Sequence, residues 1–411
     1  MSSEDEARRK ELKPQVDKER AISLAKELFN FDAVNASQLE SYDDNNFRLT
    51  DADGKSYTLK VSNGVESGDH KLLVAQNHLL AVLADKGVGC PFPKRAKGGQ
   101  FYTSVELPVK SGKASLAVRL MSWVEGPTMQ ASPCSPELME KAGAYLGRLD
   151  AAMTTFHDPA LIRKHAWDIK HTPGLRDFVS SIEDASKRAL VLSVMDAFEA
   201  KVLPKSGIFR HSAVHGDYND ANIILTEDLS DVAGVIDFGD SVRTWLVNEV
   251  AIAMAYAMLS PLAREAKDPV GAAALLLRGY QLAYPLAPGE ATHLRTLVAA
   301  RLATSVTLGS YSYQQDPSNK YLLLHQEPAW EALHLLWNQL PEVHTRALWE
   351  KACMGVPASV LQQVSGSMWM GGKRKRPPEV LPITFVTGNA NKLREVKQML
   401  GAEDGASAEG S

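Results

Sequence analysis

Three polar residues lie in one short segment, with types and spacing that suit the transfer of a phosphoryl group. Asp217 ends the tripeptide His215-Gly216-Asp217, Asn222 follows five residues later, and Asp237 comes directly after an apolar run. Phosphoryl transfer requires an oriented hydroxyl nucleophile and divalent cations that neutralise charge on the moving group, while the protein does little covalent chemistry. These carboxylate and amide side chains suit both requirements.

Two short apolar runs, residues 223–225 and 232–236, are expected to form strands that bring these side chains to one rim. In the protein-kinase pattern, an aspartate, four intervening residues and an asparagine form the catalytic loop, and a later Asp-Phe-Gly binds the metals. The second motif here reads Asp237-Phe238-Gly239. An isolated Asp-Phe-Gly is most often a turn, so the order of the motifs and the apolar strands before them carry the kinase interpretation.

The sequence before this segment predicts a compact lobe built around an antiparallel sheet. Asp53-Gly54 is typical of a tight hairpin turn, and glycines at 87 and 89 favour the end of a helix. Residues 110–113 form a turn-like break between two further apolar runs. The expected order is strand 41–50, strand 55–62, helix 72–83, strand 101–109 and strand 115–124.

A second, mainly helical lobe is expected after Glu125-Gly126-Pro127, which reads as a hinge. Ser135-Pro136-Glu137 supplies an N-cap, a proline at the first helical position and an early acid, so a helix should begin there. Residues 270–308 and 330–348 are expected to add packed helices. The apolar stretch at 250–263 is too short for a bilayer, which needs about 20 residues, and predicts a buried helix.

Composition favours a small, soluble substrate over a macromolecular partner. The 411 residues include 45 basic and 49 acidic side chains, so a net charge of -4 predicts attraction neither to nucleic acid nor to an anionic membrane. The three cysteines, Cys90, Cys134 and Cys353, are far apart and form no metal or redox motif. With no leader pattern at the N-terminus, we expect a cytoplasmic protein, and the sequence leaves its oligomeric state open.

The loop around Asp217 resembles the aminoglycoside phosphotransferase and choline kinase superfamily, because a glycine directly precedes the aspartate. Within it, the chain is most similar to the hydroxylysine kinases over residues 20–350, through the motifs at 41–47, 57–63, 76–78, 215–222, 234–240 and 249–251. This resemblance implies an α+β, bilobal protein-kinase-like fold with a small antiparallel-sheet N-lobe and a mainly helical C-lobe. The expected parts are an extension (1–20), N-lobe (21–125), C-lobe (126–355), basic linker (356–380) and C-terminal fragment (381–411).

The resemblance also implies roles for individual side chains and an activity. Asp217 would orient the acceptor hydroxyl, Asn222 and Asp237 would bind Mg²⁺, and Lys60 would contact the nucleotide phosphates. The implied reaction transfers the γ-phosphate of GTP or ATP to 5-hydroxy-L-lysine, with homoserine and choline as rival acceptors. Other residues implied at the nucleotide are Asn45, Asn46 and Phe47 over the phosphates, and the backbone around Met121 and Trp123 at the base.

The partner of Lys60 is left open by the sequence. Kinase-like folds usually place a helical glutamate opposite this lysine, but the corresponding stretch reads Leu73-Val74-Ala75. Glu66 or Asp69 could reach it from the start of the helix, and Gln76 could hold it more weakly. A nucleotide-binding pseudokinase is therefore an alternative to an active enzyme.

A dibasic amino acid would require carboxylates for its ammonium groups and a cation or backbone site for its carboxylate. Asp240 and Glu249 are candidates for the first task, and Arg243 is a candidate for the second. In the alternative interpretation, Glu249 caps the helix that it begins and Arg243 is a solvated surface charge.

The C-terminal part carries a second resemblance. The basic run at 373–378 is expected to be a linker, although such runs also act in nuclear import. Residues 381–392 are similar to the beginning of inosine triphosphate pyrophosphatases, in which the matching Thr387, Asn389 and Lys392 belong to the nucleotide site. A complete domain of that kind needs roughly 100 residues, so this fragment alone should not hydrolyse nucleotides.

Overall fold

The computed structural model describes residues 8–41, 43–315 and 326–354. The chain divides into two units, residues 1–369 and 370–411, and all described residues belong to the first. The expected linker and the pyrophosphatase-like fragment lie outside the described residues. The expected boundaries of the extension and the lobes likewise stay predictions.

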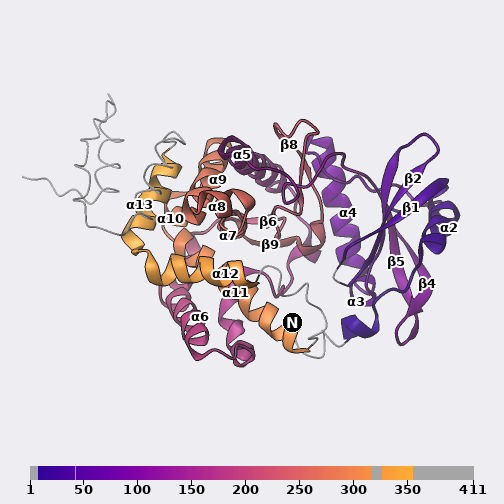
Figure 1. Cartoon of the computed structure of the whole chain (residues 1–411). Helices are drawn as coiled ribbons and strands as arrows, with labels where there is room; N and C mark the ends of the chain where they lie inside the picture. Colours follow the sequence, from indigo (N-terminus) through magenta and orange to yellow (C-terminus); the bar gives the residue numbers. More distant parts are fainter. Residues whose placement is uncertain (1–7, 42, 316–325, 355–411) are drawn as a thin grey trace, which may run out of the picture. The chain divides into compact units, whose positions relative to one another are not determined.

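The N-terminal part of the first unit is built on a five-stranded sheet with the order β1-β2-β3-β5-β4, in which every neighbouring pair is antiparallel. Helices α2 and α4 lie on opposite sides of this sheet (Figure 1). The elements are α2 (Lys18–Phe29), β1 (Ala33–Leu39), β2 (Asn45–Asp51), β3 (Ser56–Val61), α3 (Gly64–Ser67), α4 (His70–Asp85), β4 (Thr103–Val109) and β5 (Gly112–Ser122).

Alternation along the strands decides which side chains face the core and which face the site. Phe47, Leu59 and Leu120 are fully buried in one apolar cluster with Leu24 and Phe29 of α2. Successive side chains of a strand point to opposite faces. The residue after Leu59 therefore faces the α4 side, which is how this sheet presents Lys60. The predicted β2–β3 hairpin, including its turn at Asp53-Gly54, is confirmed.

The C-terminal part is mainly helical, as predicted, and contains two small antiparallel pairs, β6 with β9 and β7 with β8. Its strands and main α-helices are α5 (Pro136–Met153), α6 (Ala185–Ala197), β6 (His211–Val214), β7 (Ile223–Leu225), β8 (Val232–Val235), β9 (Val242–Trp245), α7 (Leu246–Ala257), α8 (Pro261–Ala266), α9 (Pro269–Ala283), α11 (Leu294–Gln315), α12 (Gln326–His334) and α13 (Glu342–Cys353). The remaining helices are η1 (Pro159–Leu161), η2 (Ile169–Asp177), η3 (Val179–Ser181), η4 (Phe198–Val202), η5 (Leu203–Ile208), η6 (Phe238–Asp240), α10 (Pro288–Ala291) and η8 (Leu335–Gln339).

Local sequence explains how this part begins. The Ser135 side chain accepts a hydrogen bond from the backbone N–H of Leu138, so α5 starts at its predicted cap. At the hinge, Gly126 has a φ of 124°, and a Cβ there would lie 1.9 Å from the carbonyl oxygen of Leu225. Only glycine fits that position. Among the described residues, no helix combines the length and the apolar character needed to cross a bilayer.

Candidate active site

The loop that carries Asp217 begins where β6 ends, and its backbone is held from several sides. Gly216 has a φ of 87°, and a Cβ there would lie 2.7 Å from the carbonyl oxygen of Asp240, so glycine is required. The buried His215 accepts the N–H of Asp217 at Nδ1 (3.2 Å), so its Nε2 donates to the carbonyl of Ile236 (2.9 Å). His215 thus ties the loop to the residue that follows β8.

Both carboxylate oxygens of Asp217 are engaged. Oδ2 accepts from Nδ2 of Asn219 (2.8 Å) and Nδ2 of Asn222 (3.2 Å), and Oδ1 accepts from Nη2 of Arg301 (3.0 Å). Burial raises the pKa of Asp217, and the Arg301 charge opposes that rise. The carboxylate is therefore held in one orientation, with a quarter of its side chain (26%) accessible.

Asn222 and Asp237 have oxygens that fit a divalent cation. The amide nitrogen of Asn222 is occupied by the backbone oxygen and the carboxylate of Asp217 (3.0 and 3.2 Å), which leaves its Oδ1 as an available ligand. Asp237 is exposed, with Oδ1 3.8 Å from Nζ of Lys60. Its φ of 62° is uncommon for a residue other than glycine. Carboxylate and amide oxygens are ligands that Mg²⁺ accepts, so this pair is suited to bind it.

Lys60 has an acidic partner that the sequence did not suggest. Its Nζ lies 2.6 Å from Oδ2 of Asp44, the residue directly before β2. Burial lowers the pKa of Lys60, but Asp44 and Asp237 outweigh this effect and raise it above its usual value. Burial disfavours the charged form of Asp44 too, yet Lys60 and the N–H of Asn63 hold its pKa below the usual range. Lys60 is thus a fixed ammonium at the edge of the site.

The three partners considered from the sequence are all engaged elsewhere. Glu66 forms an ion pair with Arg9 at 2.5 Å, and Asp69 caps α4 by accepting from the N–H of Leu72. Gln76 accepts from Nη1 of Arg119 and does not contact Lys60. The apolar residue Val74, from the stretch that raised the question, is 39% exposed.

The residues expected over the nucleotide phosphates point in different directions. Phe47 is fully buried in the apolar cluster under α2, and Oδ1 of Asn45 accepts the backbone N–H of Val16 (3.0 Å). Asn46 is paired with Lys60 across the β2–β3 ladder, so it shares the face of the lysine. Its buried Oδ1 has no partner among the described residues. Of the three, only Asn46 is placed to face a ligand.

Met121 and Trp123 lie at the end of β5, where the chain passes to the hinge. Met121 is buried and pairs with Thr58 of β3, while Trp123 is half-buried and donates its N–H to the carbonyl of Ser56 (3.4 Å). The guanidinium of Arg48 stacks on the Trp123 ring, 4.5 Å from its centroid. A flat aromatic side chain thus borders the position expected for the base.

The three residues considered for substrate binding divide between surface and interior. Asp240 is partly exposed, and its Oδ1 lies 3.3 Å from Nε2 of His165. Burial raises its pKa, but the hydrogen bond and charge of His165 and the charge of Arg163 outweigh this and lower it. Arg243 donates to Nδ1 of His157 (2.9 Å).

Glu249 occupies a different environment. Its side chain is completely buried, and its carboxylate accepts the N–H of Gly216 (2.8 Å). A role in direct substrate binding does not fit this burial. Glu249 supports the backbone of the loop that carries Asp217 from the first turn of α7, a contact that depends on packing and that the sequence does not reveal.

Comparison with known proteins assigns the family. Residues 35–286 match the family model of the phosphotransferase enzyme family. The chain belongs to this family. A hydroxylysine kinase of Mus musculus is 30% identical over 345 residues, which cover 79% of this chain and 90% of that protein. Together these relationships make the chain a small-molecule kinase, a phosphotransferase that acts on an alcohol group.

Solved structures confirm the fold predicted from the sequence. An amicoumacin kinase in complex with AMP-PNP and Ca²⁺ aligns with a TM-score of 0.61 at 16% identity. The alignment covers 83% of this chain and 97% of that kinase. A microcompartment-associated aminopropanol kinase aligns with a TM-score of 0.58 at 19% identity. This alignment covers 82% of this chain and 98% of that kinase. The chain therefore has the α+β kinase-like architecture of these two kinases.

In this phosphotransferase, Gln76 of α4 links the sheet to the Asp237 motif. Its Nε2 donates to the carbonyl of Gly239 (3.0 Å), while its Oε1 accepts from Arg119 (3.3 Å), which lies opposite Lys60 in the β3–β5 ladder. Arg163 donates to the same Gly239 carbonyl (2.9 Å). Gln76, from the matched motif at 76–78, thus works as a hydrogen-bonded connector rather than as the partner of Lys60.

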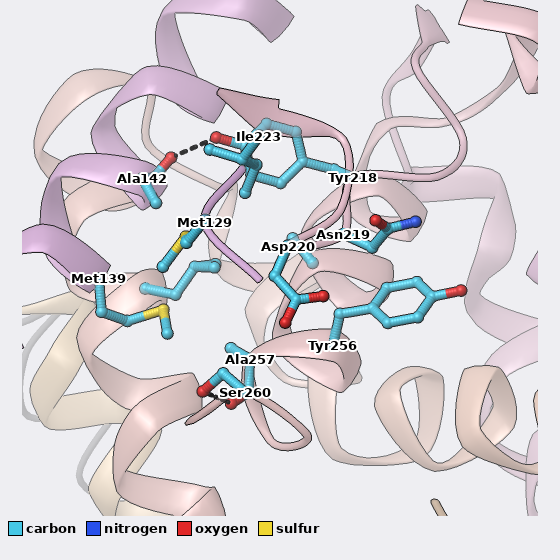
Figure 2. A pocket seen from close by; sticks show the side chains of 12 residues that line it. Met129, Met139, Ala142, Tyr218, Asn219, Asp220, Ile223, Tyr256, Ala257 and Ser260 are labelled. Carbon is cyan, nitrogen blue, oxygen red and sulfur yellow. Dashed lines mark hydrogen bonds between the residues drawn. The ribbon is translucent and has the colours of Figure 1, made fainter. Parts of the chain in front are cut away.

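A small pocket of this phosphotransferase is lined in part by Tyr218, Asn219 and Asp220, the residues that follow Asp217 in the chain (Figure 2). Its walls are mostly apolar, and the Tyr218 hydroxyl beside it donates to the carbonyl of Ala142 (2.8 Å). Tyr256 comes from α7, and its ring lines the pocket next to Asp220. The pocket therefore combines apolar walls with an acidic side chain near Asp217.

Arg301 is the site residue that sequence reasoning missed. It lies in the middle of α11, 84 residues after Asp217, in a run of buried apolar side chains. Its position within this apolar run could have revealed it, because an arginine is almost never fully buried unless it is paired. The sequence alone does not identify the partner.

The Lys60–Asp44 contact can be tested by replacing Asp44 with asparagine. We expect the KM for nucleotide to rise about tenfold, because the loss of one charge-assisted hydrogen bond leaves Lys60 less firmly placed. Steady-state kinetics with varied nucleotide measures this change. Asp43→Asn is the matched control, since Asp43 forms its ion pair with Arg9 (2.6 Å) and acts on Lys60 only as a more distant charge. Equal effects of the two substitutions would contradict the assignment of Asp44 as the partner.

Proposed function

We propose that the chain transfers the γ-phosphate of GTP or ATP to a hydroxyl of an amino acid or amino alcohol, with 5-hydroxy-L-lysine as the favoured acceptor. The observation that carries this proposal is the convergence of Asp217, Asn222 and Asp237 with Lys60, whose ammonium is 3.8 Å from Asp237. The 30% identity to a hydroxylysine kinase supports the choice of acceptor.

Asp217 would orient the acceptor hydroxyl and accept its proton as the phosphoryl group is transferred. Lys60 would hold the phosphates of the donor, and Asn222 and Asp237 would hold Mg²⁺ through their free oxygens. Bound there, the cation would neutralise charge on the phosphates. The related amicoumacin kinase was solved with AMP-PNP and Ca²⁺, which supports a nucleotide and a divalent cation at this site.

We assign the binding of the acceptor's charged groups to Asp240 and Arg243. Asp240 is partly exposed, and the charges of His165 and Arg163 favour its ionised form, which suits an ammonium group. Arg243 is the candidate for a substrate carboxylate, since it contacts His157 and no carboxylate among the described residues. These two residues match one ammonium group and the carboxylate of a hydroxylated amino acid.

An active enzyme is favoured over a nucleotide-binding pseudokinase. The pseudokinase alternative rested on a missing partner for Lys60, and Asp44 fills that place at 2.6 Å. The contacts that hold Asp217, Asn222 and Lys60 in place support an active enzyme.

The function is tested with an acceptor panel. Purified protein with Mg²⁺ and either GTP or ATP is given hydroxylysine, lysine, homoserine, choline or an aminoglycoside, and the phosphorylated product is measured by mass spectrometry. We expect hydroxylysine to give a kcat/KM at least about tenfold above every other acceptor. Lysine is the matched control, because it lacks only the hydroxyl and should give no product.

Other outcomes point to other functions. A higher kcat/KM for homoserine or choline would replace the acceptor, and nucleotide binding without any product would favour the pseudokinase. The pyrophosphatase-like fragment, which lies outside the described residues, is examined by ending the chain at residue 380. We expect phosphotransfer to be retained by this variant, and pyrophosphate release from inosine triphosphate to be absent from both proteins.

A further inference from the structure

We propose that Arg301 is a positioning residue that holds the Asp217 carboxylate in its reactive orientation. The proposal rests on the function proposed above and extends it to a residue outside the kinase motifs. Nη2 of Arg301 donates to Oδ1 of Asp217 (3.0 Å), and the two asparagines of the loop bind the other oxygen. Removing Arg301 would free one of the two carboxylate oxygens.

The guanidinium of Arg301 is itself fixed by its surroundings. It donates to the Tyr256 hydroxyl (2.9 Å) and to the carbonyl of Trp167 (3.1 Å). Its central carbon lies 5.0 Å from the centroid of the Trp167 ring and 5.2 Å from that of the Tyr256 ring. Stacking on aromatic rings favours a planar guanidinium over an ammonium. The site therefore fits an arginine specifically.

The charged residues around Asp217 explain why a cation is needed next to its carboxylate. Asp240 and Asp237 carry the same charge as Asp217, so both disfavour its ionised form. The loop HGDYNDAN from residue 215 to 222 contains no lysine or arginine. Helix α11 supplies the missing charge, with the Arg301 side chain only 2% exposed. A buried charge is costly unless it is paired, so apolar packing alone does not explain an arginine at this position.

The test uses a matched arginine of the same helix as its control. Arg295 also lies on α11, stacks on Trp337 (4.6 Å) and donates to the carbonyl of Leu336 (2.7 Å). Arg301→Met is expected to lower kcat about 100-fold, with the KM for nucleotide changed less than about threefold, because misplacing the carboxylate affects the reaction more than binding. Arg295→Met should lower the melting temperature and leave kcat within about threefold.

Chemical rescue separates positioning from a general loss of structure. Guanidinium chloride at millimolar concentration is expected to restore kcat of Arg301→Ala about tenfold, since the small cation fits the space left between the two rings. It should not raise kcat of the wild type or of Arg295→Ala. If Arg301→Met and Arg301→Ala do not fold, Arg301→Lys tests the proposed role instead. It keeps the charge but loses the stacked, forked geometry, so kcat should fall about tenfold.

The outcomes are distinguishable from those for the function itself. A wild-type protein that phosphorylates no acceptor overturns both proposals. A wild type that turns over normally, with equal losses for Arg301→Met and Arg295→Met and no response to guanidinium, overturns only the role of Arg301. An Arg301→Lys variant with kcat within twofold of the wild type also overturns it.

Discussion

Replacing Asp217 with asparagine is expected to lower kcat for phosphotransfer about 1000-fold, because the side chain loses the negative charge that accepts the hydroxyl proton. The amide has nearly the same shape, so the loop should persist. It also places an NH₂ group where one carboxylate oxygen now accepts, so the side chain loses either the hydrogen bond from Arg301 or those from Asn219 and Asn222. Initial rates at saturating nucleotide and acceptor measure this loss.

Nucleotide binding provides the internal reference for this variant. We expect Asp217→Asn to be stabilised by Mg²⁺ and GTP as much as the wild type is, because the role proposed for Asp217 is at the acceptor hydroxyl and not at the nucleotide. Asp228→Asn is the surface control, since Asp228 lies in the turn between β7 and β8 and accepts only from neighbours such as Ser230. An Asp217→Asn variant that keeps more than about a tenth of the wild-type kcat would rule out the base assigned here.

Asp237→Asn is expected to raise the Mg²⁺ concentration needed for half-maximal activity at least tenfold and to lower kcat/KM about 100-fold. The reason is the loss of a carboxylate ligand. Asparagine is the appropriate replacement because Asp237 has a φ of 62°, a conformation that asparagine tolerates and alanine does not. The effect is then chemical rather than conformational.

The measurement for Asp237→Asn is a Mg²⁺ titration, followed both by initial rate and by melting temperature with GTP present. Asp228→Asn again serves as the control and should titrate like the wild type. Wild-type Mg²⁺ dependence in the Asp237 variant would mean that the cation is held elsewhere, and the assignment of this residue would be wrong.

Local pattern was sufficient for most of the fold. The β2–β3 hairpin, α4 and the β4–β5 pair follow from turn residues and from runs of apolar side chains, and α5 follows from its cap. The strand β1 was missed because it lies at the edge of the sheet, where four of its seven residues are exposed and only Ala36 is buried. An edge strand buries too little apolar surface to leave a clear period of two in the sequence.

Contacts between distant residues could not be predicted in the same way. Asp44 pairs with Lys60 through the β2–β3 register and through the N–H of Asn63, so an acid before the strand replaces the helical acid that motif reasoning expected. Glu249 has the residue type of a substrate ligand and yet is buried beneath the loop. Residue type alone does not distinguish a carboxylate that meets solvent from one that holds a backbone N–H.

The sequence by itself determined the chemistry-bearing residues that lie close together in the chain. Asp217, Asn222 and Asp237 are separated by one loop and two short strands, so their order and spacing already specify their arrangement. Only the tertiary structure decided what holds them. Arg301 reaches Asp217 from 84 residues away, because the packing of α11 against the rest of the lobe places a buried guanidinium where the loop has no cation of its own.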